Sequence, residues 1–190
     1  MAEVAANNKE GNSSTAPQPQ SWSGLVKQVE ELIQGKNFSD AEKLALEALA
    51  ISEDYPPDDN RQGITLELLV DIYYHTKQYI YAAPVMMRLL QMYRRCLGLS
   101  HPDTATVTFN AGRLYHEWAK FEEAQAFYNL ALKLKREVYG DAHPEVKALL
   151  EHCEQLKRDI KAPKTMPRPV VTRRPNRMTK TGQWDAMKVE

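Results

Sequence analysis

Apolar side chains recur at helical spacing from Trp22 to Ile160, with large apolar residues three or four positions apart. Polar stretches, most of them containing Gly or Pro, interrupt this pattern at residues 35–37, 55–60, 75–78, 98–102, 119–120 and 140–144. These interruptions predict seven helices of about 12 to 18 residues. No segment shows the sustained apolar and polar alternation, rich in Val, Ile or Thr, that indicates a strand. The pattern therefore predicts an all-α domain.

The chain also repeats itself with a period of 42 residues. Gly98 and Gly140 are separated by this distance, and so are His101 and His143, each of which precedes a proline. A fixed period in this range is typical of stacked helical arrays, in which each unit buries its apolar face against its neighbours. Such arrays usually present a concave surface to another chain. Because the two histidines stand in equivalent connections, we expect them to have structural roles.

Small residues in the third helix pair mark the place where its two helices approach each other. We expect these helices over residues 104–119 and 121–138, with Gly112 in the first and Ala124 and Ala131 in the second. A glycine inside a helix costs about 1 kcal/mol relative to alanine. A packing reason is therefore expected at Gly112, and a close helix crossing supplies one.

The third pair contains AGRLY at residues 111–115 and KFEEA at residues 120–124, followed by Tyr128 and Ala131. With these residues it resembles a tetratricopeptide repeat. The 42-residue period and the Gly-x-x-His-Pro-Asp/Glu connection are similar to the longer, kinesin-light-chain type of repeat. The resemblance implies a right-handed α-solenoid of three helix pairs and a C-terminal capping helix. The expected units are about 22–54, 62–96 and 104–138, with the cap at 145–162.

Composition divides the chain into three parts. Residues 1–20 are mostly Asn, Ser, Gln, Ala and Pro, which predicts a disordered N-terminal tail. Residues 21–162 are the expected tetratricopeptide-repeat domain. Residues 163–190 contain several prolines and carry seven Lys and Arg against two Asp and Glu, a net charge of +5. We expect this last part to be a basic, Pro-rich disordered tail.

Pro84 departs from the regular helical pattern of the second unit. A proline is tolerated in the first turn of a helix, where its missing N–H has no partner in any case. We therefore expect the fourth helix to begin at about Ile80 to Tyr81. The run from Tyr79 to Tyr81 is read as packing between repeats, with a secondary contact patch as the alternative.

The resemblance further implies that the first helix of each pair lines an inner groove that binds a protein or peptide. Asn110 is the leading candidate, because an amide both donates and accepts hydrogen bonds and can hold a peptide backbone. Lys27 and Leu68 stand at the equivalent positions, so a full asparagine ladder is not expected. Arg113 can pair with a partner's carboxylate, the alternative being a solvated or intramolecular pair worth at most about 1 kcal/mol. The candidate groove residues are Lys27, Glu30, Glu67, Asp71, Tyr74, Phe109, Asn110, Arg113, His116 and Gln155.

The basic tail offers a second mode of contact. Short basic segments dock on acidic surfaces, nucleic acid or anionic lipid, or only improve solubility. The run Gln183-Trp184-Asp185 also resembles the tryptophan-acidic peptides that kinesin-light-chain repeats bind. One hypothesis is therefore that the tail occupies its own groove or that of a neighbour. The candidate tail residues are Arg173, Arg174, Arg177, Trp184 and Asp185.

Other features of the sequence exclude several classes of function. Lys plus Arg and Asp plus Glu both number 25, so the overall charge points to neither nucleic acid nor a membrane surface. No run of about 18 apolar residues predicts a membrane span, and the first residues lack the features of a secretory signal. The isolated Cys96 and Cys153 indicate buried thiols in a reducing cytoplasm. His116-Glu117 lacks the second histidine of a zinc-protease helix, because Lys120 stands in its place. No metal, cofactor or catalytic set is expected.

The sequence thus predicts a cytoplasmic, non-enzymatic adaptor or scaffold that holds a peptide segment or a subunit in its concave groove. A first alternative is a subunit of a larger assembly that is anchored through the basic tail. A second is a nucleic-acid-associated factor, which is disfavoured because no folded nucleic-acid module accompanies the charge. Salt dependence separates this last class, since phosphate contacts weaken steeply with salt.

Overall fold

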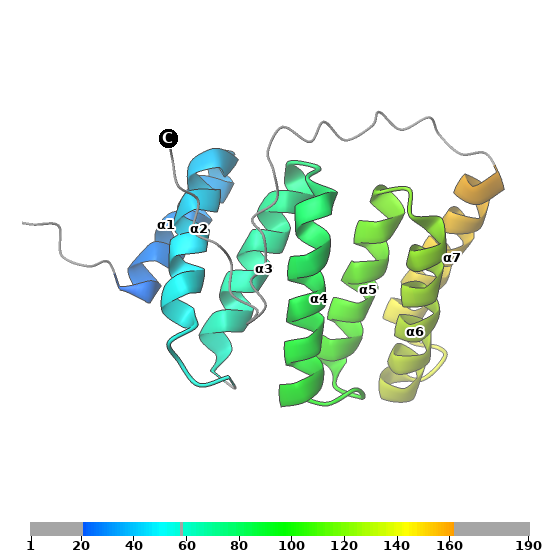
Figure 1. Cartoon of the computed structure of the whole chain (residues 1–190). Helices are drawn as coiled ribbons and strands as arrows, with labels where there is room; N and C mark the ends of the chain where they lie inside the picture. The colour runs from blue at the N-terminus through cyan, green and yellow to red at the C-terminus, as the bar shows by residue number, and fades with distance from the viewer. Residues whose placement is uncertain (1–20, 58, 162–190) are drawn as a thin grey trace, which may run out of the picture.

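The computed structural model describes residues 21–57 and 59–161, which form seven helices and no strand. Helix pairs stand side by side along the array, and α7 closes the row (Figure 1). Each helix packs on the next one in sequence. This arrangement confirms the predicted all-α solenoid, while the predicted tails lie outside the described residues. The helices are α1 (Trp22–Gln34), α2 (Phe38–Ser52), α3 (Asn60–His75), α4 (Tyr79–Cys96), α5 (Pro102–Glu117), α6 (Phe121–Tyr139) and α7 (Pro144–Lys161).

The repeat is visible in the backbone where the first helix of each pair ends. Lys36, Lys77 and Ala119 all have a φ of 57°, in the left-handed region. In each case the next residue's N–H donates to the carbonyl five residues earlier, at 2.8–2.9 Å. This is the hydrogen bond of a Schellman-type helix end, a position that usually holds glycine. The same turn therefore joins the two helices of every pair.

The two His-Pro connections also have the same geometry. His101 precedes α5, and its Nδ1 accepts a hydrogen bond from the Asp103 N–H at 3.2 Å. His143 precedes α7, and its Nδ1 accepts from the Glu145 N–H at 3.2 Å. In both helices the proline that follows is the first residue, where its missing N–H costs nothing. The structural roles predicted for both histidines are confirmed, since each satisfies an otherwise unpaired donor of a helix start.

Gly112 lies at the closest approach between α5 and α6. A Cβ atom at this position would be 2.4 Å from Cδ1 and 2.7 Å from Cε1 of the Tyr128 ring. Ala124 and Ala131 of α6 are completely buried. These contacts confirm the close helix crossing that the small residues predict.

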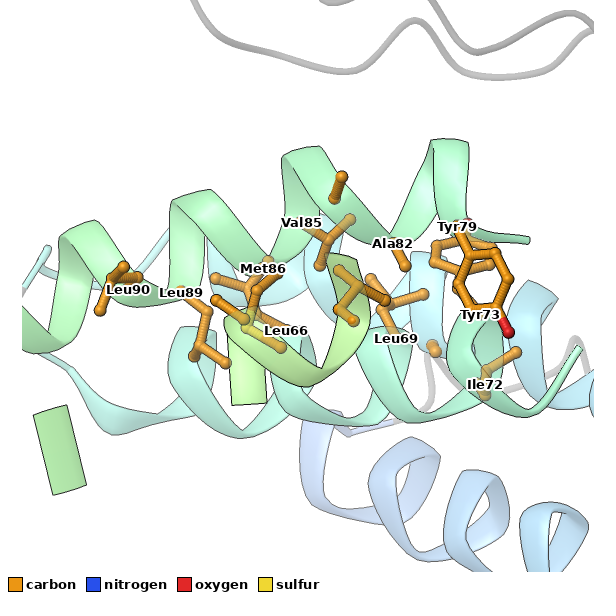
Figure 2. Packing of buried hydrophobic residues seen from close by; sticks show 14 of the residues in the cluster. Leu66, Leu69, Ile72, Tyr73, Tyr79, Ala82, Val85, Met86, Leu89 and Leu90 are labelled. Atoms are coloured by element: carbon orange, nitrogen blue, oxygen red, sulfur yellow. The ribbon is translucent and has the colours of Figure 1, made fainter. Parts of the chain in front are cut away.

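The core between α3 and α4 holds the middle of the array together. Leu66, Leu69 and Ile72 of α3 face Val85 and Leu89 of α4, and all five side chains are at most 3 % exposed (Figure 2). Burial of each such side chain contributes about 1.5–3 kcal/mol. Because this packing fixes one face of α3 against α4, the side chains on the opposite face of α3 also have a defined orientation.

The expected start of the fourth helix is wrong. Helix α4 begins at Tyr79, so Pro84 is its sixth residue and lies beyond the first turn. Tyr79 is only 9 % exposed, and its burial in the core extends the helix toward its N-terminus. Pro84 has no N–H to donate to the carbonyl of Ile80, and both residues lie on the exposed side of the helix, where Ile80 is 37 % exposed. Of the aromatic run, Tyr79 and Tyr81 pack between repeats, whereas Ile80 faces solvent.

Candidate protein-binding groove

Two neighbouring cavities run along α3, α5 and α7, and we call them together the groove. The first has a volume of about 580 Å³ and is lined by Glu67, Val70, Asp71, Tyr74, His75, Met86, Leu89, Val107, Asn110 and Arg113. The second has a volume of about 510 Å³ and is lined by Arg113, His116, Glu117, Phe121, Tyr128, His152, Gln155 and Asp159. Arg113 lines both cavities, so they adjoin at this residue and together extend from the second helix pair to the cap.

The first cavity combines an apolar floor with acidic walls. Met86, Leu89 and Val107 of the floor belong to the hydrophobic core and are at most 6 % exposed. The walls carry Glu67, whose Oε1 accepts from the Tyr93 hydroxyl, and Asp71, whose Oδ1 lies 3.3 Å from Nε2 of His75. Burial and the bond to Glu67 raise the pKa of Tyr93, so this hydroxyl remains a donor. A side chain with an apolar stem and a polar or cationic tip fits such a cavity.

Asn110 and Arg113 occupy the junction of the two cavities, one turn apart on α5. Arg113 donates from Nη2 to the Tyr74 hydroxyl at 3.4 Å, and its guanidinium carbon lies 5.7 Å from the centre of the Tyr74 ring. The intramolecular ion pair considered for Arg113 does not form with a carboxylate of residues 21–57 or 59–161. Within those ranges the Asn110 amide has no hydrogen-bond partner either. Both polar groups are therefore available to a ligand.

The second cavity is built around His116. Its Nε2 lies 3.1 Å from Oδ2 of Asp159, and its Nδ1 lies 3.3 Å from the Tyr128 hydroxyl. Gln155 donates from Nε2 to both oxygens of Asp159 at 3.0 Å. Burial raises the pKa of Tyr128, so the hydroxyl stays protonated beside the imidazole. This network fixes α7 against α5 and α6, and it gives His116 and Gln155 a structural role in addition to their place on the wall.

Phe109 and His152 join α5 to the cap beneath this network. Their rings meet edge to face, with centroids 5.0 Å apart. The pKa of His152 lies below its usual 6.5, because burial disfavours the charged imidazole and the Arg113 and His116 side chains add to the effect. The uncharged form of His152 is therefore favoured at pH 7, and this side chain adds no positive charge to that of Arg113.

Seven of the ten predicted groove residues line one of the two cavities, and three do not. The three exceptions are Lys27 and Glu30, which are exposed on α1, and Phe109, which packs against the Tyr128 ring 5.8 Å away. Lys27 lies 3.9 Å from Glu31 of its own helix. The seven are Glu67, Asp71, Tyr74, Asn110, Arg113, His116 and Gln155.

Sequence reasoning missed the apolar floor and one acidic residue. Met86 and Leu89 belong to the second helix of their pair, so an assignment restricted to first helices cannot include them. Asp159 follows Gln155 by four residues and shares its helix face, so the helical period could have indicated it. The predicted tail contacts Arg173, Arg174, Arg177, Trp184 and Asp185 lie outside the described residues.

The described ranges contain neither a metal site nor a membrane span. Over residues 21–57 and 59–161, no three His, Cys, Asp or Glu side chains gather as a metal site requires. Over the same ranges, no helix combines the length and the apolar character that crossing a bilayer takes.

Comparisons with known proteins agree with the fold and the repeat. Residues 61–137 match the family model of the tetratricopeptide repeat, whereas no curated protein sequence matches the chain. Among solved structures, BtubC (BKLC) from P. vanneervenii is similar with a TM-score of 0.59 and 15 % identity, over 77 % of this chain and 67 % of that one. A putative kinesin light chain with nearly identical TPR-like repeats from Podosopora anserina has a TM-score of 0.57 and 14 % identity, over 79 % of this chain and 80 % of that one. The predicted tetratricopeptide repeat is confirmed over residues 61–137, and the two structures show the fold.

Proposed function

We propose that this chain is an adaptor that holds a protein segment in its groove, because residues 61–137 match the tetratricopeptide repeat, a repeat that generally mediates protein–protein interaction. The observation that carries this proposal is that the two cavities adjoin at Arg113 and follow one another along the array. Their volumes of about 580 and 510 Å³ lie in the range of ordinary ligand sites. An extended peptide is the ligand whose shape matches two adjoining cavities in a row.

The chemistry of the groove suits a peptide backbone with side chains of mixed character. The Asn110 amide offers both a donor and an acceptor to a peptide unit, whatever its sequence. The Arg113 fork offers several N–H donors to a carbonyl or carboxylate group. The floor of Met86 and Leu89 takes an apolar side chain or the stem of a long one. Backbone recognition at the junction and side-chain selection in the first cavity follow from this arrangement.

We further propose that the protein acts without catalysing a reaction and that it works in the cytoplasm. The first point is supported by the family, whose repeats typically serve as interaction modules. The second is supported by Cys96 and Cys153, which are both free thiols, although the prediction that they are buried is wrong: Cys96 is exposed and Cys153 is half-buried. Isolated thiols are typical of proteins in reducing compartments.

The test is a quantitative pull-down from native lysate with the full-length chain and single-residue variants. Asn110→Ala and Arg113→Ala change the groove, while Asn129→Ala changes an exposed amide of α6 that lines neither cavity and serves as the control. A central interface residue costs about 1–2 kcal/mol on truncation, so each groove variant should lose about 5- to 30-fold in partner affinity. Full retention of the partner by both groove variants would contradict binding in the groove.

The basic segment supports the alternative that the chain is anchored in an assembly through residues 163–190. Its net charge of +5 is the observation that favours this alternative. A chain ending at Ala162 separates the two functions in the same pull-down. A partner that is lost on truncation but kept by Asn110→Ala would assign recognition to the basic segment. If that partner is nucleic acid, its binding will also weaken steeply between low and moderate salt.

A further inference from the structure

The groove carries a net negative charge. Its lining includes the carboxylates of Glu67, Asp71, Glu117 and Asp159 against the single guanidinium of Arg113. Counting histidine as neutral, four negative charges and one positive charge leave a net charge of −3. The described bonds of Glu67 and Asp71 go to Tyr93 and His75, and neither goes to a lysine or arginine. Within residues 21–57 and 59–161, the negative charge of the first cavity's wall is therefore not neutralised by a lysine or arginine ion pair.

The compensating charge of this neutral chain lies in its last part. Residues 163–190 carry a net charge of +5 and residues 1–20 a net charge of −1, which leaves −4 for residues 21–162. The two large charges have opposite signs and belong to adjacent parts of one chain. Opposite potentials of this kind attract, and the tether between them keeps the effective concentration high.

The basic segment starts beside the groove. Helix α7 ends at Lys161, two residues after Asp159, which lines the second cavity. The 12 residues from 162 to 173 reach about 20 Å as a random coil and about 37 Å as an extended polyproline helix. Packed helices lie about 8–10 Å apart, so the path from α7 past α5 to α3 is on the order of 20 Å. Arg173 and Arg174 can therefore reach the first cavity.

We propose that residues 163–190 occupy the groove of their own chain, with basic side chains beside Glu67 and Asp71, and so compete with an external partner. This inference rests on the groove of the proposed function and names its first occupant. The apolar floor receives the methylene stem of an arginine or lysine, and the two carboxylates on the wall receive its charged tip. Partner binding then requires displacement of the segment, which makes the chain self-inhibited.

The experiment is paramagnetic broadening of amide NMR signals in the full-length chain. A spin label is attached at Thr179→Cys in a background in which Cys96→Ser and Cys153→Ala remove the native thiols. We expect the amide signals of Tyr74 and Asn110 to broaden several-fold more than signals from exposed residues of α2 and α6. At about 1 M NaCl, where the screening length is about 3 Å, this difference should disappear. Equal broadening of both groups of signals at low salt would overturn the proposal.

Neutral variants test the role of the acidic wall. Glu67→Gln with Asp71→Asn removes two charges from the first cavity. Glu47→Gln with Glu137→Gln removes two from exposed positions of α2 and α6 that line neither cavity. An exposed ion pair changes an equilibrium about 1.5- to 5-fold, so the groove pair should lower the bound-to-free ratio about 2- to 25-fold. The control pair should leave it unchanged. A groove pair that behaves like the control pair would contradict the proposal.

Mixing a spin-labelled chain with a separate isotope-labelled chain tells whether the occupant is a neighbour. Groove broadening in the mixture equal to that within a single chain would assign the segment to a second copy and overturn binding to its own groove. Failure of this inference is distinguishable from failure of the proposed function. If the segment leaves the groove signals unbroadened while Asn110→Ala still loses the external partner, the adaptor function stands and self-inhibition is excluded.

Discussion

Replacement of Gly112 by alanine tests the close crossing of α5 and α6, on which the shape of the groove depends. The new Cβ would lie 2.4 Å from Cδ1 of Tyr128 and 3.3 Å from Cβ of Phe127. Carbon atoms in good contact are about 3.5–4.0 Å apart, so one partner must move by about 1 Å. Tyr128 is 1 % exposed and its hydroxyl lies 3.3 Å from Nδ1 of His116, so the ring cannot turn away without losing this contact and its packing. The helices themselves must separate.

The magnitude follows from two opposing terms. Overpacking of a buried site costs about 1–3 kcal/mol, and the immobile ring places this site at the upper end. Alanine recovers about 1 kcal/mol of helix propensity relative to glycine. We therefore expect Gly112→Ala to lower the free energy of unfolding by about 2 kcal/mol. In a domain of this size the midpoint of thermal unfolding should fall by about 4–8 °C.

The assay is urea unfolding of the full-length chain followed by far-ultraviolet circular dichroism. Gly63→Ala is the matched control, because a Cβ there would meet the flexible methyl end of Met92 at 3.3 Å. This control should be neutral or gain up to about 1 kcal/mol from helix propensity. In a Tyr128→Ala background the ring is absent, and Gly112→Ala should no longer destabilise the chain. A Gly112→Ala variant as stable as the parent would refute the steric argument.

Three further measurements test other parts of the structure. Ala119→Gly should raise the free energy of unfolding by about 0.5–1 kcal/mol, because residue 119 has a φ of 57°, which is unfavourable for alanine. A loss of stability in urea unfolding would contradict this. Glu145→Ala should lower that free energy by about 1–3 kcal/mol, because it leaves the ammonium group of Lys135 (4 % exposed) without its ion-pair partner. Lys135→Met removes the buried charge itself and should be nearly neutral. Equal losses of stability in the two variants would contradict this reasoning. By NMR titration the pKa of His152 should lie below 6.5. The folded state then binds fewer protons than the unfolded state, so the free energy of unfolding should fall as the pH decreases below 6.5. If His152→Gln leaves that pH dependence unchanged, the assignment to His152 is wrong.

The sequence predicted the helices and the repeat because both depend on local signals. The period of 42 residues, the His-Pro connections and Gly112 each have a short-range physical cause, and the structure shows each one. Pro84 misled the prediction of a helix start, because burial of Tyr79 outweighs the loss of one exposed hydrogen bond. Here a tertiary contact overrode a local rule.

The groove was predictable only in part. Residues of α3, α5 and α7 follow from the helical period once the pairs are recognised, which explains Glu67, Asp71 and Asn110. The floor residue Met86 comes from a second helix, and its place depends on how deeply α4 sits between α3 and α5. Lys27 shows the converse, because its repeat position matches but α1 contributes to neither cavity. Such outcomes depend on the packing of whole helices, which local spacing does not contain.

Site-specific photo-crosslinking from the groove tests the central claim most directly. A photoreactive phenylalanine analogue replaces Tyr74 in the groove or, as a control, Asn129 on α6, and crosslinked peptides are identified by mass spectrometry. The account predicts that position 74 captures a defined protein segment, either from a partner or from residues 163–190, and that position 129 does not. Equal capture from both positions, or capture from position 129 alone, would contradict the assignment of the groove as the binding site.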